Sequence, residues 1–256
     1  MRFRTQRRVF LAAMAVLAAF MLWGMAGLPS FGTFAGAYSR LLNATAVSER
    51  AATNVVASVT FDYRGFDTMG EEFILFAAVV GVAILLRAQR DEEERSPTEE
   101  AEGRRAPAAS NAVRALGLGL VGPIVVFGVY VVAHGHLTPG GGFQGGVVLA
   151  TAALLVYLSG EYVTLRRVRP EPLTDAAEAA GAGGYVAIGL LGMVAAGSFM
   201  ENFLPIGTPG ALLSAGTILP INVAVGLEVA AGFVLLLSEF LEQTLVLSPR
   251  EGGAGP

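Results

Sequence analysis

Several carboxylates gather where an apolar segment of the sequence begins. The stretch from Asp62 to Glu72 reads DYRGFDTMGEE, and hydrophobic residues follow it. Carboxylates at the mouth of a membrane segment can collect cations or relay protons. Asp62, Asp67 and Glu71 are therefore candidates for an ion path.

A structural interpretation of the same stretch stays open beside this one. Thr68 and Glu71 have the spacing of a capping box at a helix start. Gly65 would then supply a turn, and Asp62 would pair with Arg64. The two interpretations are compatible with each other.

A glycine-rich stretch is the second candidate, and it runs from His134 to Gly146 as HGHLTPGGGFQGG. Its letters from Gly140 to Gly145 match G-x-G-x-x-G, but no βαβ pattern surrounds them and no Lys follows as in a P-loop. Pro139 and the glycines instead predict a broken helix between two membrane spans. Such a break is tolerated at membrane depth where protein or water satisfies the backbone.

Two residue types in this stretch suggest particular roles. Gly142 and Gly146 have the spacing of a small-residue packing face. His136 is a candidate proton relay because imidazole titrates near neutral pH, and a hydrogen-bonding helix cap is the alternative. The motif residues are Pro139, Gly140, Gly141, Gly142, Phe143, Gln144, Gly145 and Gly146.

Glu228 is the third candidate, because it lies near the middle of the apolar segment Ile218–Leu237. A charged side chain at mid-bilayer costs roughly 2.5–3.5 kcal/mol on insertion scales. We expect it to face a bundle interior, either paired or protonated, with any cationic partner supplied by another subunit. Asn222 is expected on the same face. A neutral Glu228 in a structural hydrogen bond is the alternative.

Composition excludes several classes of protein. The chain has no Cys and two His, and all 17 of its basic residues are Arg. We therefore predict no catalytic residue, no metal site and no cofactor, and no nucleic-acid partner. An intramembrane enzyme lacks a nucleophile–base or metal constellation in this sequence.

The elements that must position these residues are transmembrane helices. The 256 residues are 54% hydrophobic and 15% charged, which departs from soluble domains toward lipid. About 20 apolar residues cross a bilayer. We therefore predict an all-α integral membrane protein with about six transmembrane helices and a broken-helix, glycine-rich connection. The expected spans are Val9–Leu28, Thr68–Leu86, Leu116–Ala133, Phe143–Gly160, Gly181–Met200 and Ile218–Leu237.

The distribution of Arg predicts the orientation. Arg residues precede the first span, follow the second and follow the fourth, whereas residues 201–217 contain none. The positive-inside rule then places both termini in the cytoplasm. The first segment resembles a signal peptide, but its apolar run is long and no clear cleavage site ends it, so we expect a retained helix.

Composition also divides the chain into parts. We expect a two-span module over residues 1–90, a charged cytoplasmic linker over 91–112, a four-span module over 113–245 and a disordered tail over 246–256. Within the first module, Ala51–Phe61 is apolar but too short to cross. It is expected to form an interfacial helix or a half-helix packed against a partner.

Both motifs carry a resemblance to a known family. The stretch GHLTPGGGFQGG, between two spans, resembles the signature of the B subunit of multisubunit Mrp-type cation/proton antiporters. The stretch FDYRGFDTMGEE resembles the E-type subunit of membrane-bound hydrogenases, which in many Mrp systems forms the C-terminal end of the large A subunit. The resemblance covers roughly Ala51–Leu86 and Leu116–Leu241. The positions that match are Asp62, Arg64, Asp67, Thr68, Glu71 and His136, then Pro139 to Gly146.

The resemblance implies a function. Members of this family exchange Na⁺, or another monovalent cation, for H⁺ in a hetero-oligomer of a prokaryotic cell membrane. The pumping helices with buried Lys belong to large A- and D-type subunits, and this chain has no Lys. It therefore resembles a non-catalytic accessory subunit that contacts those subunits and smaller ones, as well as lipid. The alternative is a membrane scaffold subunit of a complex I-like or hydrogenase-linked redox ion pump.

Overall fold

The computed structural model describes residues 3–28, 36–86, 97–98, 109–242 and 246–247. Most of the predicted linker and tail lies outside these residues. Within them, β1 (Pro97–Thr98) and β2 (Val246–Leu247) form a two-residue antiparallel pair. The chain divides into two units, residues 1–41 and 42–256, which are described separately.

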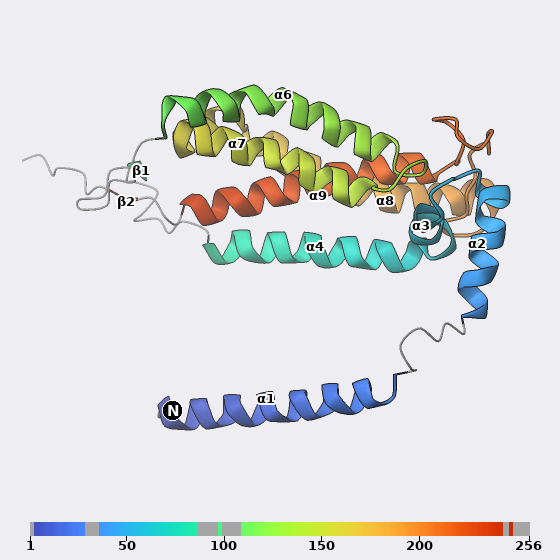
Figure 1. Cartoon of the computed structure of the whole chain (residues 1–256), viewed down its shortest axis with the longest axis horizontal. Helices are drawn as coiled ribbons and strands as arrows, with labels where there is room; N and C mark the ends of the chain where they lie inside the picture. Colours follow the sequence, from blue (N-terminus) through green and yellow to red (C-terminus); the bar gives the residue numbers. More distant parts are fainter. Residues whose placement is uncertain (1–2, 29–35, 87–96, 99–108, 243–245, 248–256) are drawn as a thin grey trace, which may run out of the picture. The chain divides into compact units, whose positions relative to one another are not determined.

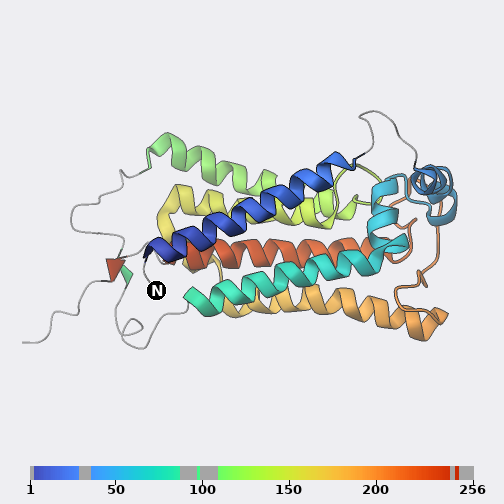
Figure 2. The ribbon, with the colours of Figure 1, turned by 90° about the horizontal axis from the view of Figure 1, so that it is seen from below.

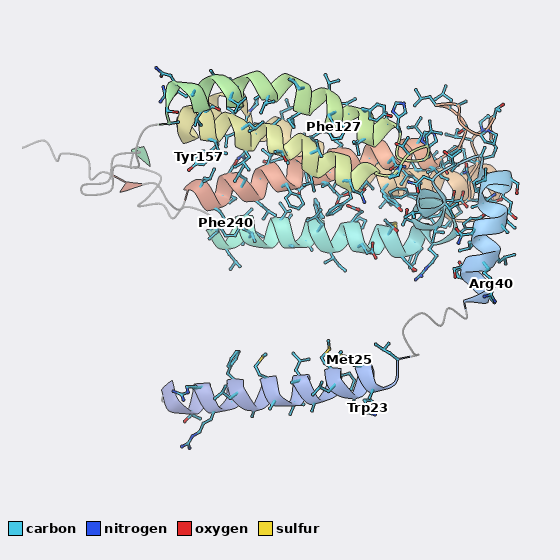
Figure 3. The ribbon with its side chains drawn as sticks, viewed as in Figure 1. Trp23, Met25, Arg40, Phe127, Tyr157 and Phe240 are labelled. Carbon is cyan, nitrogen blue, oxygen red and sulfur yellow. The ribbon has the colours of Figure 1, made fainter. Side chains whose placement is uncertain are left out.

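The first unit contains α1 (Phe3–Ala26) and the start of α2 (Ala37–Arg50). Apolar side chains of α1 are exposed all around the helix, among them Trp23 and Met25 (Figure 3). A helix that is apolar on every side is typical of a membrane span. Residues Arg7–Ala26 are long and apolar enough to cross a bilayer.

The second unit is a bundle of five long helices. They are α4 (Gly65–Leu86), α6 (Asn111–Ala133), α7 (Gly142–Val168), α8 (Glu171–Ala196) and α9 (Ile218–Glu242). Each contains a segment able to cross a membrane, so the described residues hold six candidate spans with that of α1. The all-α membrane architecture is confirmed.

Helix α9 is the core of the bundle. It packs against α4, α6, α7 and α8, and Figures 1 and 2 show it among them. In its most apolar part 61% of the residues are buried, against 33% or fewer in each other span. The other helices therefore leave broad apolar faces for lipid or companion proteins. Phe127 on α6 and Phe240 on α9 are both exposed on the bundle (Figure 3).

The short apolar run 51–61 folds onto the bundle of its own chain. It forms α3 (Val55–Ser58) and the first part of a π-helical turn, η1 (Val59–Tyr63). Phe61 is buried in one cluster with Tyr185 and Ile221. The run is short, as predicted, and α8 and α9 of the same chain supply a packing surface for it. We call this end of the bundle the α3 end, and the opposite end the far end.

The glycine-rich break connects α6 to α7 at the α3 end (Figure 1). Gly140 and Gly141 have φ values of 136° and 149°, which favour glycine. Gly142 and Gly146 lie against α9, where an added Cβ would come within 2.8 Å and 2.7 Å of the Cβ atoms of Val225 and Val229. The small-residue spacing thus places the backbones of α7 and α9 in close contact.

Two helix starts differ from the prediction. α4 begins at Gly65, so Thr68 lies buried inside its first turn and the capping box at Thr68 was wrong. α8 begins at Glu171, ten residues before the predicted span, because its first turns combine apolar residues with charges that a hydropathy window rejects.

Gly142→Leu is expected to reduce the yield of folded protein several-fold, because Val225 leaves no room for a side chain. Overpacking of this kind costs roughly 1–3 kcal/mol. Size-exclusion profiles of detergent-solubilised protein measure the effect. The matched control is Gly119→Leu on α6, where an added Cβ meets no atom within 4 Å. Equal profiles for the two variants would contradict the close α7–α9 contact.

Candidate functional site

The predicted acidic motif forms one wall of an open pocket at the α3 end. The pocket has a volume of about 620 Å³, and we call it the acidic pocket. It is lined by Arg50, Asp62, Tyr63, Arg64, Gly65, Phe66, Asp67, Ser198, Phe199, Met200, Glu201 and Asn202. The motif therefore meets the loop after α8, a contact that the sequence did not reveal.

Asp62 is the most enclosed carboxylate of this pocket, with a side chain 7% exposed. Its oxygens accept hydrogen bonds from Arg50 Nε at 2.7 Å and Asn202 Nδ2 at 2.9 Å. The predicted pair between Asp62 and Arg64 was wrong, because Arg64 instead bonds Asp67, three residues on. Charge-assisted bonds of this kind fix Asp62 in one position.

Asp67 and Glu71 are exposed on the first turns of α4. The pair between Arg64 and Asp67 is also exposed and contributes little to stability. Asp67 is thus available to water and to ions in the pocket, while Glu71 stands one turn further along the helix.

Asn54 ties the glycine-rich break to the first module. Its Nδ2 donates to the carbonyls of Gly135 at 2.7 Å and Thr138 at 3.1 Å. Its Oδ1 caps α3 by accepting from the N–H of Val56. The N–H of Asn54 itself bonds the carbonyl of His136 at 3.0 Å. One side chain thus holds the turn and starts a helix.

Asn222 supports the same break from α9. It is fully buried, and its Oδ1 accepts from the N–H of Gly142 at 2.8 Å. Its Nδ2 donates to the carbonyl of Ile218. Asn222 therefore satisfies the start of α7 in the bundle interior.

His136 is fully buried in this turn. Neither ring nitrogen has a hydrogen bond of good geometry within the described part of the chain. Burial lowers the pKa of His136, although the nearby backbone of Leu212 and Ala211 opposes that shift. The neutral imidazole is therefore favoured.

The remaining motif residues point in different directions. Pro139 and Gln144 are exposed, while Gly145 lies against α6 near the backbone of Gly128. Phe143 packs edge-on against Phe233 of α9, with ring centroids 6.2 Å apart. The break is therefore a packing junction among three helices.

Glu228 is buried in α9 with 1% of its surface exposed. It lies on the side of α9 that faces α8, since Gly181 of α8 packs directly against it. The structure does not bring Glu228 to the acidic pocket or to the glycine-rich break.

Two further buried carboxylates escaped the sequence analysis, Glu72 on α4 and Glu178 on α8. Glu228 is therefore one of three buried carboxylates on the long helices of the bundle. The sequence analysis treated Glu72 as part of the exposed acidic motif. It missed Glu178 because this residue precedes Gly181, the predicted start of its span. Within the described ranges, no three His, Asp or Glu residues are grouped as metal ligands.

The fold and these sites define a multi-pass membrane protein, and comparisons with known proteins match two regions of it. Residues 112–235 match the model of a domain related to the MnhB subunit of the Na⁺/H⁺ antiporter. Residues 3–102 match the model of the MBH E subunit. The chain therefore belongs to the family of fused membrane subunits in which an MBH E-type module precedes an MnhB-type module.

Individual relatives match large parts of this chain. An uncharacterized protein of Methanocaldococcus jannaschii, MJ1307, is 33% identical over 198 residues, which cover 70% of this chain and 73% of that protein. A chain of the archaeal membrane-bound sulfane sulfur reductase is 31% identical with a TM-score of 0.71, covering 93% of this chain and 98% of that one. A chain of the Mrp complex from Dietzia sp. is 25% identical with a TM-score of 0.69, covering 91% and 26%.

Asn54→Ala should destabilise the protein by roughly 1–3 kcal/mol, because two carbonyls of the turn and one helix N–H lose their partner. Thermal unfolding in detergent measures the loss. Asn43→Ala is the matched control, since Asn43 is an exposed asparagine of α2. A similar melting temperature in both variants would show that the turn is held by other contacts.

His136 should make stability depend on pH. Its folded pKa lies below the ordinary value of about 6.5, so the unfolded chain binds the proton more readily and stability falls as pH drops through that range. Melting temperatures compared between about pH 7.5 and about pH 5.5 should fall less in His136→Gln than in the unmodified protein. His134→Gln serves as control, and an identical fall in the His136 variant would refute the assignment.

Proposed function

We propose that this chain is a non-catalytic membrane subunit of a multisubunit monovalent cation/proton antiporter, where it forms subunit interfaces and lines part of the cation path. The acidic pocket is the observation that carries the proposal. It places Asp62 and Asp67 at the end of a membrane-capable helix, in a chain whose modules match antiporter and hydrogenase subunits.

The pocket has properties suited to a cation entrance. Asp62 is held by Arg50 and Asn202, so it shapes the wall, while Asp67 and the neighbouring Glu71 face water. Carboxylates at a membrane entrance raise the local concentration of cations. Exposed carboxylates also release their ions readily, which an entrance requires.

The exposed apolar faces are suited to companion subunits as well as to lipid. Leu116, Val126 and Phe127 on α6 are exposed, as are Ile74, Ile84 and Leu85 on α4. We propose that large A- and D-type antiporter subunits and smaller subunits cover part of these faces, with Na⁺ and H⁺ as the transported ions. The Arg distribution supports cytoplasmic termini in a prokaryotic cell membrane.

A redox-linked complex is the second candidate function. The chain covers 98% of its match in the sulfane sulfur reductase complex but 26% of its match in the Mrp complex. The joined modules thus correspond to a whole subunit of the former. Purification of the complex through a tag on this chain separates the two, because iron–sulfur or flavin absorbance in the purified material would favour the redox-linked assembly.

Asp67→Ala or Glu71→Gln should lower cation/proton exchange several-fold in membrane vesicles that contain the whole complex, because the entrance loses negative charge. A Na⁺ pulse that dissipates a preformed pH gradient provides the measurement. Glu49→Gln is the matched control, since it removes an exposed carboxylate of α2 outside the pocket lining. Normal assembly with unchanged exchange in both entrance variants would defeat the cation-path role.

A further inference from the structure

Three carboxylates lie inside the bundle, on three different helices, and none belongs to the acidic pocket. Glu72 of α4 and Glu178 of α8 are each 5% exposed, and Glu228 of α9 is 1% exposed. Within the described part of the chain, both oxygens of Glu228, Oε2 of Glu72 and Oε1 of Glu178 have no hydrogen-bond partner. Buried carboxyl groups without partners lower stability, so by default they are candidates for a function.

Glycines set the register that brings Glu178 and Glu228 together. A Cβ at Gly181 of α8 would lie 2.6 Å from the Cβ of Glu228. A Cβ at Gly232 of α9 would lie 3.5 Å from Oε1 of Glu178. Gly232 follows Glu228 by about one turn, so the two carboxyl groups lie about one turn apart in depth, on facing helices.

The contact between α4 and α9 places Glu72 on the other side of Glu228. Val79 of α4 packs on Gly232, with a methyl carbon 3.2 Å from the position of an added Cβ. Both helices start at the α3 end and run in the same direction (Figure 1). Glu72 precedes Val79 by about two turns, which puts it roughly one turn nearer the α3 end than Glu228.

Glu228 interacts with each of the other two groups, and their further contacts lead toward both ends of the bundle. Glu228 interacts electrostatically with Glu72 and Glu178. Buried Tyr185 interacts with Glu72 and donates its hydroxyl to the carbonyl of Gly65, a residue of the acidic pocket. Toward the far end, Glu178 interacts with exposed Asp175.

The other helices packed on α9 contribute few titratable groups. The spanning part of α7, residues 142–160, contains Tyr157 and no charged residue or imidazole. α6 carries Arg114 near its start and Tyr130 near its end. Among the described residues, the carboxyl groups on α4, α8 and α9 thus form a file of acids that spans about two helical turns between the acidic pocket and the far end.

We propose that Glu72, Glu228 and Glu178 form a proton route across this subunit, between the acidic pocket and the far end of the bundle. The proposal rests on the antiporter-type function above. In each step a carboxylic acid gives its proton to the next carboxylate and is reprotonated from the preceding group. One proton moves across, and every carboxyl group returns to its starting state.

The arrangement suits protons better than a bound metal cation. A dehydrated cation needs several oxygens around one point, whereas these side chains are spaced about one helical turn apart in depth. An unpaired carboxyl group in an apolar interior is favoured as the neutral acid, which is the form that stores a proton. Water entering between neighbours would complete the hydrogen-bonded links.

Proton-coupled cation exchange by the purified complex in proteoliposomes provides the first test. Glu228→Gln and Glu178→Gln keep shape and neutral charge but cannot pass a proton, so each should lower exchange at least tenfold while the complex stays assembled. Glu228→Asp should retain part of the activity and keeps the test decisive if a Gln variant assembles poorly. Glu49→Gln is the control outside the file. An exchange rate equal to that of the unmodified complex in an assembled Glu228→Gln complex would overturn the route.

Infrared difference spectroscopy on a pH change gives a second test that does not require transport. The carboxylic acid C=O band lost in Glu228→Gln should shift in Glu178→Gln and in Glu72→Gln, because the groups share protons. An unmoved band in both variants would overturn the route. A wild-type complex that exchanges no cation would instead defeat the proposed function, and the infrared bands would still decide whether the file exists. A carboxyl band that responds to Na⁺ at constant pH would show that the three acids bind a cation, and would overturn the proton route.

Discussion

Hydrocarbon offers no hydrogen-bond partner, so a polar group that enters the bundle costs free energy unless the protein itself supplies a partner. The glycine-rich break between α6 and α7 shows how this chain meets that demand. Asn54 binds two of its carbonyls, and Asn222 binds the first N–H of α7. Both asparagines come from segments distant in sequence, so the first module and α9 stabilise the break together.

Close packing around α9 is a second consequence of the lipid environment. Glycines on α7 and α8 allow those backbones to approach α9, and Gly232 of α9 receives Val79 from α4. Without a strong hydrophobic driving force between helices in lipid, such contacts supply much of the association energy. They also determine which side chains meet, because each glycine contact fixes the register between two helices. The positions of Glu178 and Glu228 relative to each other are a direct result of that register.

Hydropathy predicted the number of long helices because lipid imposes one length on every span. It failed at Glu178, since charged residues in the first turns of α8 pushed the predicted start ten residues too late. The partner of Asp62 was also unpredictable, because Arg50 and Asn202 approach it only through tertiary structure. The spacing Gly142-x-x-x-Gly146 correctly predicted a close helix contact. Two small residues one turn apart allow any neighbouring helix to approach, so the prediction did not require the partner helix to be known.

The polar groups of the bundle fall into two kinds, and the difference bears on function. Asp62 at the α3 end is fully engaged by an arginine and an amide, which makes it part of the architecture. Glu72, Glu178 and Glu228 retain carboxyl oxygens without partners among the described residues, although Asn222 on α9 has a hydrogen-bond partner at both amide atoms. The fold can thus satisfy buried polar atoms where structure requires it. Three unsatisfied acids lower the stability of the bundle. Such groups remain able to gain and lose a proton, whereas a carboxylate held by an arginine does not, which is why we connect these three acids with proton transfer.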